Sequence, residues 1–190
     1  GANNRPDPRL DTDGKTCFLL TEQMRAYRNQ DRKKKKQKAL PMMVLRKMLE
    51  LANSPWETAV AWLLIGAIFF AMRSCEYSYT GEGIRTEILK LENLKFYSKD
   101  GMEVKHNRQA AQKVKIVFPN QKNMEKMEPV IRSRADESSI LCPVRSWGAI
   151  IDRIEGYKGT TGKTTVNTVE INGKLKKIDS STIRNRIRVA

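Results

Sequence analysis

The sequence predicts an α+β fold that is mainly α-helical, with a small antiparallel β-sheet inserted between helices. Apolar residues fall at helical spacing before residue 73 and after residue 142, whereas short β-rich segments with turn signals lie between them. The chain has 190 residues, of which 39% are apolar and 30% charged. These values exclude a globally disordered chain and indicate one domain, or one domain with a tail, that can bury a core.

The first two core helices are predicted from residue 40 onward. Apolar residues at helical spacing begin at Leu40, and Pro41 suits the first helical position. A second helix opens at residues 54–57 (SPWE), which combine a Ser N-cap, a following Pro and a Glu three residues on. It runs through 14 apolar residues, Ala59–Met72, fewer than the roughly 20 that span a bilayer. Because apolar residues surround this helix, we expect it to be the central core helix.

The middle of the chain predicts the sheet. Residues 94–97 and 102–104 are expected to form a hairpin, with the turn at Asp100-Gly101. Residues 114–118 alternate between polar and apolar side chains and are expected to add a strand. Together these segments indicate a small antiparallel sheet.

Two further helices are predicted after residue 142. Pro143 begins the first, which carries Trp147 on its apolar face. Residues 171–174 (INGK) are typical of a turn, and a last helix begins near Ser180 with Ile183 facing inward.

Residues 1–38 are predicted to be a linker or the end of a preceding DNA-binding domain, and residues 39–190 a second domain. Residues 1–16 are rich in Pro, Asp, Asn and Gly, and residues 17–27 fit either a short helix or a strand. The basic run RKKKKQK at residues 32–38 has no apolar face, so it marks the boundary. Its interpretation stays open between a solvated loop, a linker that tracks DNA and a nuclear-localisation signal.

The charge of the chain points to a polyanionic partner. Lys and Arg total 36 against 21 Asp and Glu, a net charge of +15, and the pI is about 9.9. Nucleic acid is the first candidate for such a partner, and no membrane association is expected. The 3 cysteines are widely spaced and odd in number, which is typical of a reducing compartment. We therefore expect a nuclear location in a eukaryote, a cytoplasmic one otherwise, and no secretion.

Two features resemble catalytic or nucleotide-binding motifs only superficially. Residues 159–164 (GTTGKT) look like a phosphate-binding loop, but the first glycine of that motif would fall on Tyr157, after a helical segment. His106 is the single histidine, which leaves almost no material for a histidine-based zinc site or a Ser-His-Asp triad and favours an exposed hairpin or loop histidine. No nucleotide, metal or other cofactor is expected.

Three segments in order resemble the tyrosine recombinase (phage integrase) family. Arg73 followed by Glu76 at the end of a buried helix is similar to the family's first catalytic-arginine motif. Lys122 follows the strand at residues 114–118, where the family carries a catalytic lysine on a hairpin turn. Residues 141–145 (LCPVR), before a Trp-containing helix, look like the Cys-Pro-Val segment of the eukaryotic Crypton-like branch. The resemblance covers roughly residues 40–190.

The resemblance implies a fold, a reaction and roles for these residues. The fold would be that of the catalytic domain of DNA breaking-rejoining enzymes, incomplete at its C-terminus. Arg73 would hold the scissile phosphate, Lys122 would protonate the leaving 5′-oxygen as a general acid, and Glu76 would orient neighbouring groups. The reaction implied is the DNA cleavage and rejoining of a recombinase or integrase of mobile elements, without a cofactor. Family members usually assemble as tetramers on paired DNA sites.

The sequence departs from the family pattern after the last predicted helix. The family continues with His-x-x-Arg, a later His or Trp, and a tyrosine nucleophile, and this sequence contains none of them at the expected places. Its tyrosines come too early, the last being Tyr157. The chain also opens without an initiator Met. We therefore expect the N-terminal part of a catalytic domain, lacking a complete active site.

Further basic residues are expected to hold DNA phosphates without reading sequence. They are Lys33, Lys34, Lys35, Lys36, Arg108, Lys113, Lys115 and Arg184. The alternative function is a non-catalytic basic module that binds nucleic acid. The two functions differ in one geometric demand: a recombinase requires Arg73 and Lys122 to converge on one concave surface.

Overall fold

The computed structural model describes residues 9–10, 13–30, 40–81, 87–119, 127–135 and 139–190. The chain divides into two compact units, Gly1–Ala39 and Leu40–Ala190, so the division falls just after the basic run. In the first unit, helix α1 (Phe18–Gln30) resolves the choice between helix and strand in favour of a helix.

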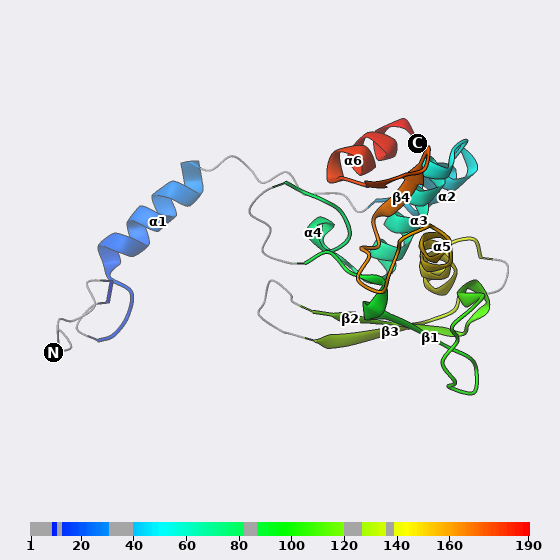
Figure 1. Ribbon diagram of the computed structural model, residues 1–190. Coiled ribbons are helices and arrows are strands. Elements are labelled where there is room, and N and C mark those ends of the chain that lie inside the picture. Colours follow the sequence, from blue (N-terminus) through cyan, green and yellow to red (C-terminus); the bar gives the residue numbers. More distant parts are fainter. Residues whose placement is uncertain (1–8, 11–12, 31–39, 82–86, 120–126, 136–138) are drawn as a thin grey trace. The chain divides into compact units, whose positions relative to one another are not determined.

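The second unit combines helices with two small antiparallel sheets, which confirms the predicted α+β class. Its α-helices are α2 (Met42–Glu50), α3 (Pro55–Phe69), α4 (Ser74–Tyr77), α5 (Pro143–Glu155) and α6 (Ser180–Val189). Its strands are β1 (Leu94–Tyr97), β2 (Lys113–Phe118), β3 (Glu128–Ser133), β4 (Thr168–Ile171) and β5 (Lys174–Lys177), with 3₁₀ helices η1 (Leu91–Asn93) and η2 (Arg108–Ala110). Figure 1 shows the β1–β3 sheet on one side of α3 and α5, and α6 on the other.

Helix α3 begins where the sequence predicts. The Ser54 hydroxyl accepts a hydrogen bond from the Glu57 backbone N–H at 3.2 Å, which satisfies one of the free donors of the first turn. The Glu57 carboxylate accepts from the backbone N–H of Asn53 at 2.8 Å, one residue before the N-cap that a capping box uses. Pro41 precedes α2 directly as its N-cap, one position earlier than expected.

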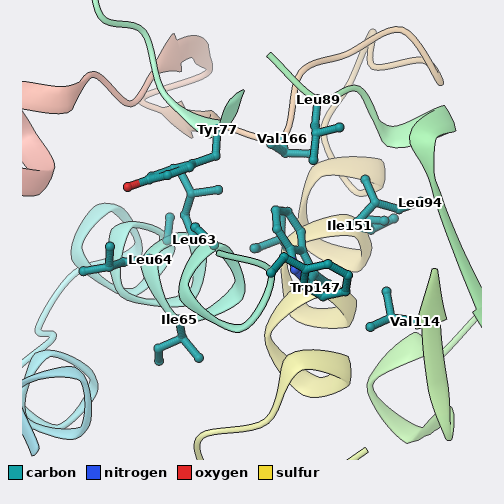
Figure 2. Packing of buried hydrophobic residues seen from close by; sticks show 14 of the residues in the cluster. Leu63, Leu64, Ile65, Tyr77, Leu89, Leu94, Val114, Trp147, Ile151 and Val166 are labelled. Atoms are coloured by element: carbon teal, nitrogen blue, oxygen red, sulfur yellow. The ribbon is translucent and has the colours of Figure 1, made fainter. Parts of the chain in front are cut away.

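The core is built around α3 and α5. Figure 2 shows Trp147 of α5 between α3 and the sheet, near Ile151. Trp147 is fully buried, and its indole ring lies directly over Gly66 of α3. Its ring also meets that of Phe70 edge-on, with ring centroids 6.4 Å apart. No helix in the described part of the chain is both long and apolar enough to cross a bilayer.

The larger sheet has the order β1-β2-β3 and alternates as β-structure requires. Phe96 and Val114 face the core as register partners, whereas the lysines between these apolar positions face outward. Strand β2 was predicted, but β3 was not, because its sequence (EPVIRS) is polar and mostly exposed. The expected strand at residues 102–104 is reduced to a single bridge, Tyr97 to Glu103. Asn107, with φ of 49°, turns the chain into η2 shortly after this bridge.

The turn of the second sheet and the start of the last helix were predicted correctly, whereas strands β4 and β5 were not predicted. Asn172 and Gly173, with φ of 52° and 73°, form the tight turn between β4 and β5, which positive φ values at both positions favour. Helix α6 begins after Asp179, whose carboxylate accepts from the backbone N–H of Thr182 at 2.7 Å. Ile183 is buried as expected.

Substituting Gly66 by Ala is expected to destabilise the fold. A Cβ at Gly66 would lie 2.8 Å from Cε2 of Trp147, and this ring is enclosed by the core. We expect Gly66→Ala to lower the free energy of unfolding by about 1–3 kcal/mol, despite the better helix propensity of alanine. Gly162→Ala is the control, because its Cβ would lie 3.5 Å from the nearest atom, an ordinary contact. Urea unfolding of both variants measures the difference; equal stabilities would contradict the packing described.

Asp179 is expected to make the stability of the chain depend on pH. The hydrogen bond from the Thr182 backbone, followed by one from Ser181, lowers the pKa of Asp179 below its usual 3.8. A carboxyl group whose pKa falls on folding adds stability above the unfolded pKa and loses it as pH falls through the folded pKa. Asp179→Asn keeps a capping side chain but does not titrate. The melting temperatures of the two proteins should therefore converge below about pH 4, and parallel curves would count against this role.

Candidate functional site

Arg73 lies immediately beyond the end of the core helix. Helix α3 ends at Phe69, and Ala71, with φ of 50°, reverses the chain so that Arg73 directly precedes α4. The Arg73 backbone N–H donates to Oε2 of Glu76 at 2.8 Å, and Nη1 of the guanidinium donates to Oε1 at 3.4 Å. The Glu76 side chain is only 6% exposed, whereas that of Arg73 is 46% exposed. A buried carboxylate therefore holds the backbone and one guanidinium nitrogen of an accessible arginine.

Arg73 and Glu76 line a cavity of about 270 Å³, which we call the Arg73 pocket. Its walls come from the residues just after α3, from α4, from the end of β2 and from alternate residues along β3. The lining residues are Phe70, Ala71, Arg73, Glu76, Phe118, Glu128, Val130 and Arg132. The pocket thus joins the predicted arginine motif to the sheet, which is far from it in sequence.

The connection that carries Lys122 begins and ends at this pocket. Phe118 ends β2 and Glu128 begins β3, and the two residues are register partners that both line the pocket. Lys122 lies in the intervening connection, within residues 120–126, which are outside the described residues. The structure therefore brings both ends of the Lys122 connection to Arg73.

Arg132 belongs to the same pocket and was not identified from the sequence. Its Nε donates to the carbonyl oxygen of Phe69 at 3.0 Å, and its guanidinium carbon lies 5.6 Å from the centroid of the Phe70 ring. In β3, Arg132 shares its side of the strand with Val130, two residues earlier. That alternation is the only signal in the sequence, and it has meaning only once β3 and its register are known.

Arg108, one of the predicted phosphate contacts, is held by carboxylates. Its Nη1 lies 2.9 Å from Asp152 Oδ1 and 2.7 Å from Glu155 Oε2, and its Nη2 donates to Glu155 Oε1 at 2.9 Å. Its side chain is 13% exposed. These ion pairs join η2 to α5 and occupy the guanidinium. We therefore do not expect Arg108 to contact a DNA phosphate.

The other predicted phosphate contacts are distributed over several elements. Lys113 and Lys115 lie on the outer side of β2, opposite the buried Val114, and neither lines the Arg73 pocket. Arg184 of α6 is exposed and lines a separate cavity with Ser74. Lys33, Lys34, Lys35 and Lys36 lie outside the described residues.

The phosphate-loop look-alike is an ordinary loop after α5. The backbone N–H of Thr161 donates to the Thr164 hydroxyl at 2.9 Å, and the Gly162 carbonyl accepts from the backbone N–H of Glu92 at 2.9 Å. These bonds attach the loop to itself and to η1. Among the described residues, no group of His, Cys, Asp and Glu side chains could hold a metal ion.

Comparison with family models, with curated proteins and with solved structures finds no match for this chain. The Arg73 pocket and the charge of the chain are therefore the features that bear on its function.

Replacing Arg108 is expected to affect stability more than DNA binding. Arg108→Ala would leave Asp152 and Glu155 without their shared partner, which should lower the free energy of unfolding by about 1–3 kcal/mol. Arg46→Ala, on the exposed side of α2, removes the same charge and serves as the control. Thermal unfolding and a DNA titration compare the variants. A larger loss of DNA affinity in Arg108→Ala than in Arg46→Ala, with unchanged stability, would show that Arg108 contacts DNA after all.

Proposed function

We propose that this chain is the N-terminal part of a tyrosine recombinase catalytic domain and that it binds duplex DNA. The observation that carries the proposal is the Arg73 pocket, because the connection bearing Lys122 starts and ends there. Convergence of Arg73 and Lys122, 49 positions apart in sequence, is the geometric demand that distinguishes this function. Phe118 and Glu128, the strand residues on either side of that connection, line the pocket with Arg73 and so support the proposal. The net charge of +15 supports a polyanionic partner.

Arg73 is suited to hold the phosphate that reacts. A guanidinium is planar and donates two parallel hydrogen bonds, so it can bind two non-bridging phosphate oxygens as negative charge grows on them. Glu76 accepts from one Nη and from the Arg73 backbone, which orients the guanidinium before DNA arrives. A fixed donor stabilises developing charge without having to reorganise during the reaction.

Lys122 would act as the general acid. When the phosphodiester breaks, the leaving 5′-oxygen needs a proton, and the ammonium group of Lys122 could supply it. Lysine suits this role better than arginine, because a guanidinium keeps its proton under all ordinary conditions.

The proposed reaction needs a tyrosine nucleophile that this chain does not supply, because its tyrosines precede the position at which the family carries it. In the proposed reaction a tyrosine attacks the phosphorus, forms a 3′-phosphotyrosyl bond and releases the 5′-hydroxyl; a 5′-hydroxyl of the partner strand then reverses the step. Because the phosphotyrosyl bond conserves the bond energy, no cofactor is required. The 190-residue sequence has no tyrosine after Tyr157, so this chain would bind and position DNA without cutting it.

The second candidate is a non-catalytic module that binds nucleic acid. Lys113, which is exposed, and Lys115, which is half-buried, favour it, because they lie on the outer side of β2, outside the Arg73 pocket, and would hold phosphates in either case. Under this alternative the pocket has no special role, and Arg73 would contribute no more than any other exposed cation.

The chain is expected to bind duplex DNA mainly through charge. Gel-shift titrations of a 20-base-pair duplex at several salt concentrations should give log affinity that falls linearly with log salt, by about 0.9 per phosphate neutralised. Arg73→Ala should weaken total binding only modestly, as should the control Arg46→Ala, since many cations share the backbone contacts. Absence of binding even at low salt would overturn both candidate functions.

The chain is expected to bind DNA without cleaving it. Incubation with a nicked suicide duplex, followed by denaturing electrophoresis, tests this expectation. No covalent protein–DNA adduct is expected from this chain alone. When a longer chain that supplies the missing residues is tested, an adduct should form, and Arg73→Ala should abolish it while Arg46→Ala should not. Equal adduct formation by both variants would refute the role of Arg73, and an adduct from the 190-residue chain would show that it does contain a nucleophile.

A further inference from the structure

We propose that Arg132 is a second phosphate ligand in the Arg73 pocket, so that two guanidinium groups hold one phosphate between them. This inference rests on the proposed function, because it takes the phosphate to be that of DNA. Arg73 comes from the turn after α3 and Arg132 from β3, and both line the same cavity of about 270 Å³. That volume accommodates a group as small as a phosphate, whereas a whole nucleotide would have to extend out of the pocket.

The Arg132 guanidinium is already fixed in place. Nε donates to the Phe69 carbonyl at 3.0 Å, Nη1 donates to the Ile131 carbonyl at 3.2 Å, and the group lies over the Phe70 ring. Within the described residues, its Nη2 forms no hydrogen bond and the group forms no salt bridge with a carboxylate. The side chain is nevertheless exposed at the pocket. A cation that is oriented by carbonyl groups and a ring keeps its charge available for an anion.

Arg73, like Arg132, has hydrogen-bond donors that are not used by the described residues. Glu76 binds one Nη of Arg73, and in the described part of the chain Nε and the second Nη make no hydrogen bond. These two donors lie on one edge of a guanidinium, which is the edge that binds phosphate oxygens in pairs. Arg73 can therefore offer a pair of donors and Arg132 a further one to the same anion.

Net charge would not draw an anion into the pocket, because two carboxylates line it as well as two arginines. Glu76 is buried and is committed to Arg73, and Glu128 stands at the start of β3. The two arginines and two glutamates cancel formally, so an anion would be selected by directed N–H donors. This distinguishes the pocket from Lys113 and Lys115, which offer charge without a fixed geometry.

A purely structural role for Arg132 makes a different prediction. Arginine near the C-terminus of a helix stabilises the last carbonyl groups, and the bond to Phe69 at the end of α3 is of this kind. If that were its whole role, replacing Arg132 would lower stability but would not change how Arg73 responds to phosphate.

The test uses the 190-residue chain with ¹⁵N-labelled arginine, titrated with inorganic phosphate at constant ionic strength. The Nε–Hε signals of Arg73 and Arg132, identified by their loss in Arg→Lys variants, should shift with one common midpoint, while the signal of Arg46 should not. In Arg132→Ala the midpoint for Arg73 should rise at least about tenfold, since hydrogen bonds between charged groups are lost. Arg132→Lys keeps the charge and guards against misfolding; it should also raise the midpoint. An Arg73 midpoint that is unchanged in a folded Arg132 variant would overturn the inference.

The same signals are then followed during titration with a 20-base-pair duplex at low salt. Shifts of both Arg73 and Arg132 are expected. Duplex binding that leaves both signals in place would overturn this inference while the DNA-binding function stands. A response to inorganic phosphate without any duplex binding would instead overturn the proposed function and leave a phosphate pocket.

Discussion

Helix α3 has no solvent-facing side, and the arrangement of the second unit follows from covering it. None of residues 56–70 is exposed, because α2, α5 and α6 pack around this helix. Trp147 approaches α3 so closely that its ring occupies the space that a side chain at Gly66 would take. An apolar helix of this kind leaves water only if other elements enclose it. The positions of α2, α5 and α6 are therefore constrained by α3.

The Arg73 pocket depends on this packing because it forms where α3 ends. Phe70 contacts the Trp147 ring on its core side, while Arg132 lies over it on the pocket side. The Phe69 carbonyl, left free at the helix end, receives a donor from β3. The same few residues thus end the core helix, attach the sheet to it and orient an arginine. A disturbance of the core at Trp147 should consequently reach the pocket through Phe70.

The basic residues, which all count equally in the net charge, differ in the structure in their exposure and in their ion pairs. Arg108 and Arg186 are largely buried and paired with carboxylates, Arg186 with Glu57 at 2.8 Å. Desolvation lowers the pKa of Arg153, whose Nη2 donates to the Thr168 carbonyl at 3.3 Å. These residues hold elements together. The net charge of +15 therefore indicates the class of partner, whereas exposure and pairing identify the cations that can meet it.

Features set by local interactions were determined by the sequence alone. The cap at Ser54, the Asn172-Gly173 turn and the start of α5 at Pro143 depend on neighbouring residues, so their patterns predicted them. Arg73 and Glu76 contact each other because they lie within one turn, whereas their catalytic roles came from the family resemblance and stay a prediction. Strand β3, the pocket and the contacts of Arg132 and Arg108 were decided only by tertiary structure. A strand as polar as β3 acquires its register from its neighbour β2, and an arginine becomes a pocket residue or an ion-pair partner through contacts dozens of residues away. Those long-range contacts leave no periodic signal in the chain itself.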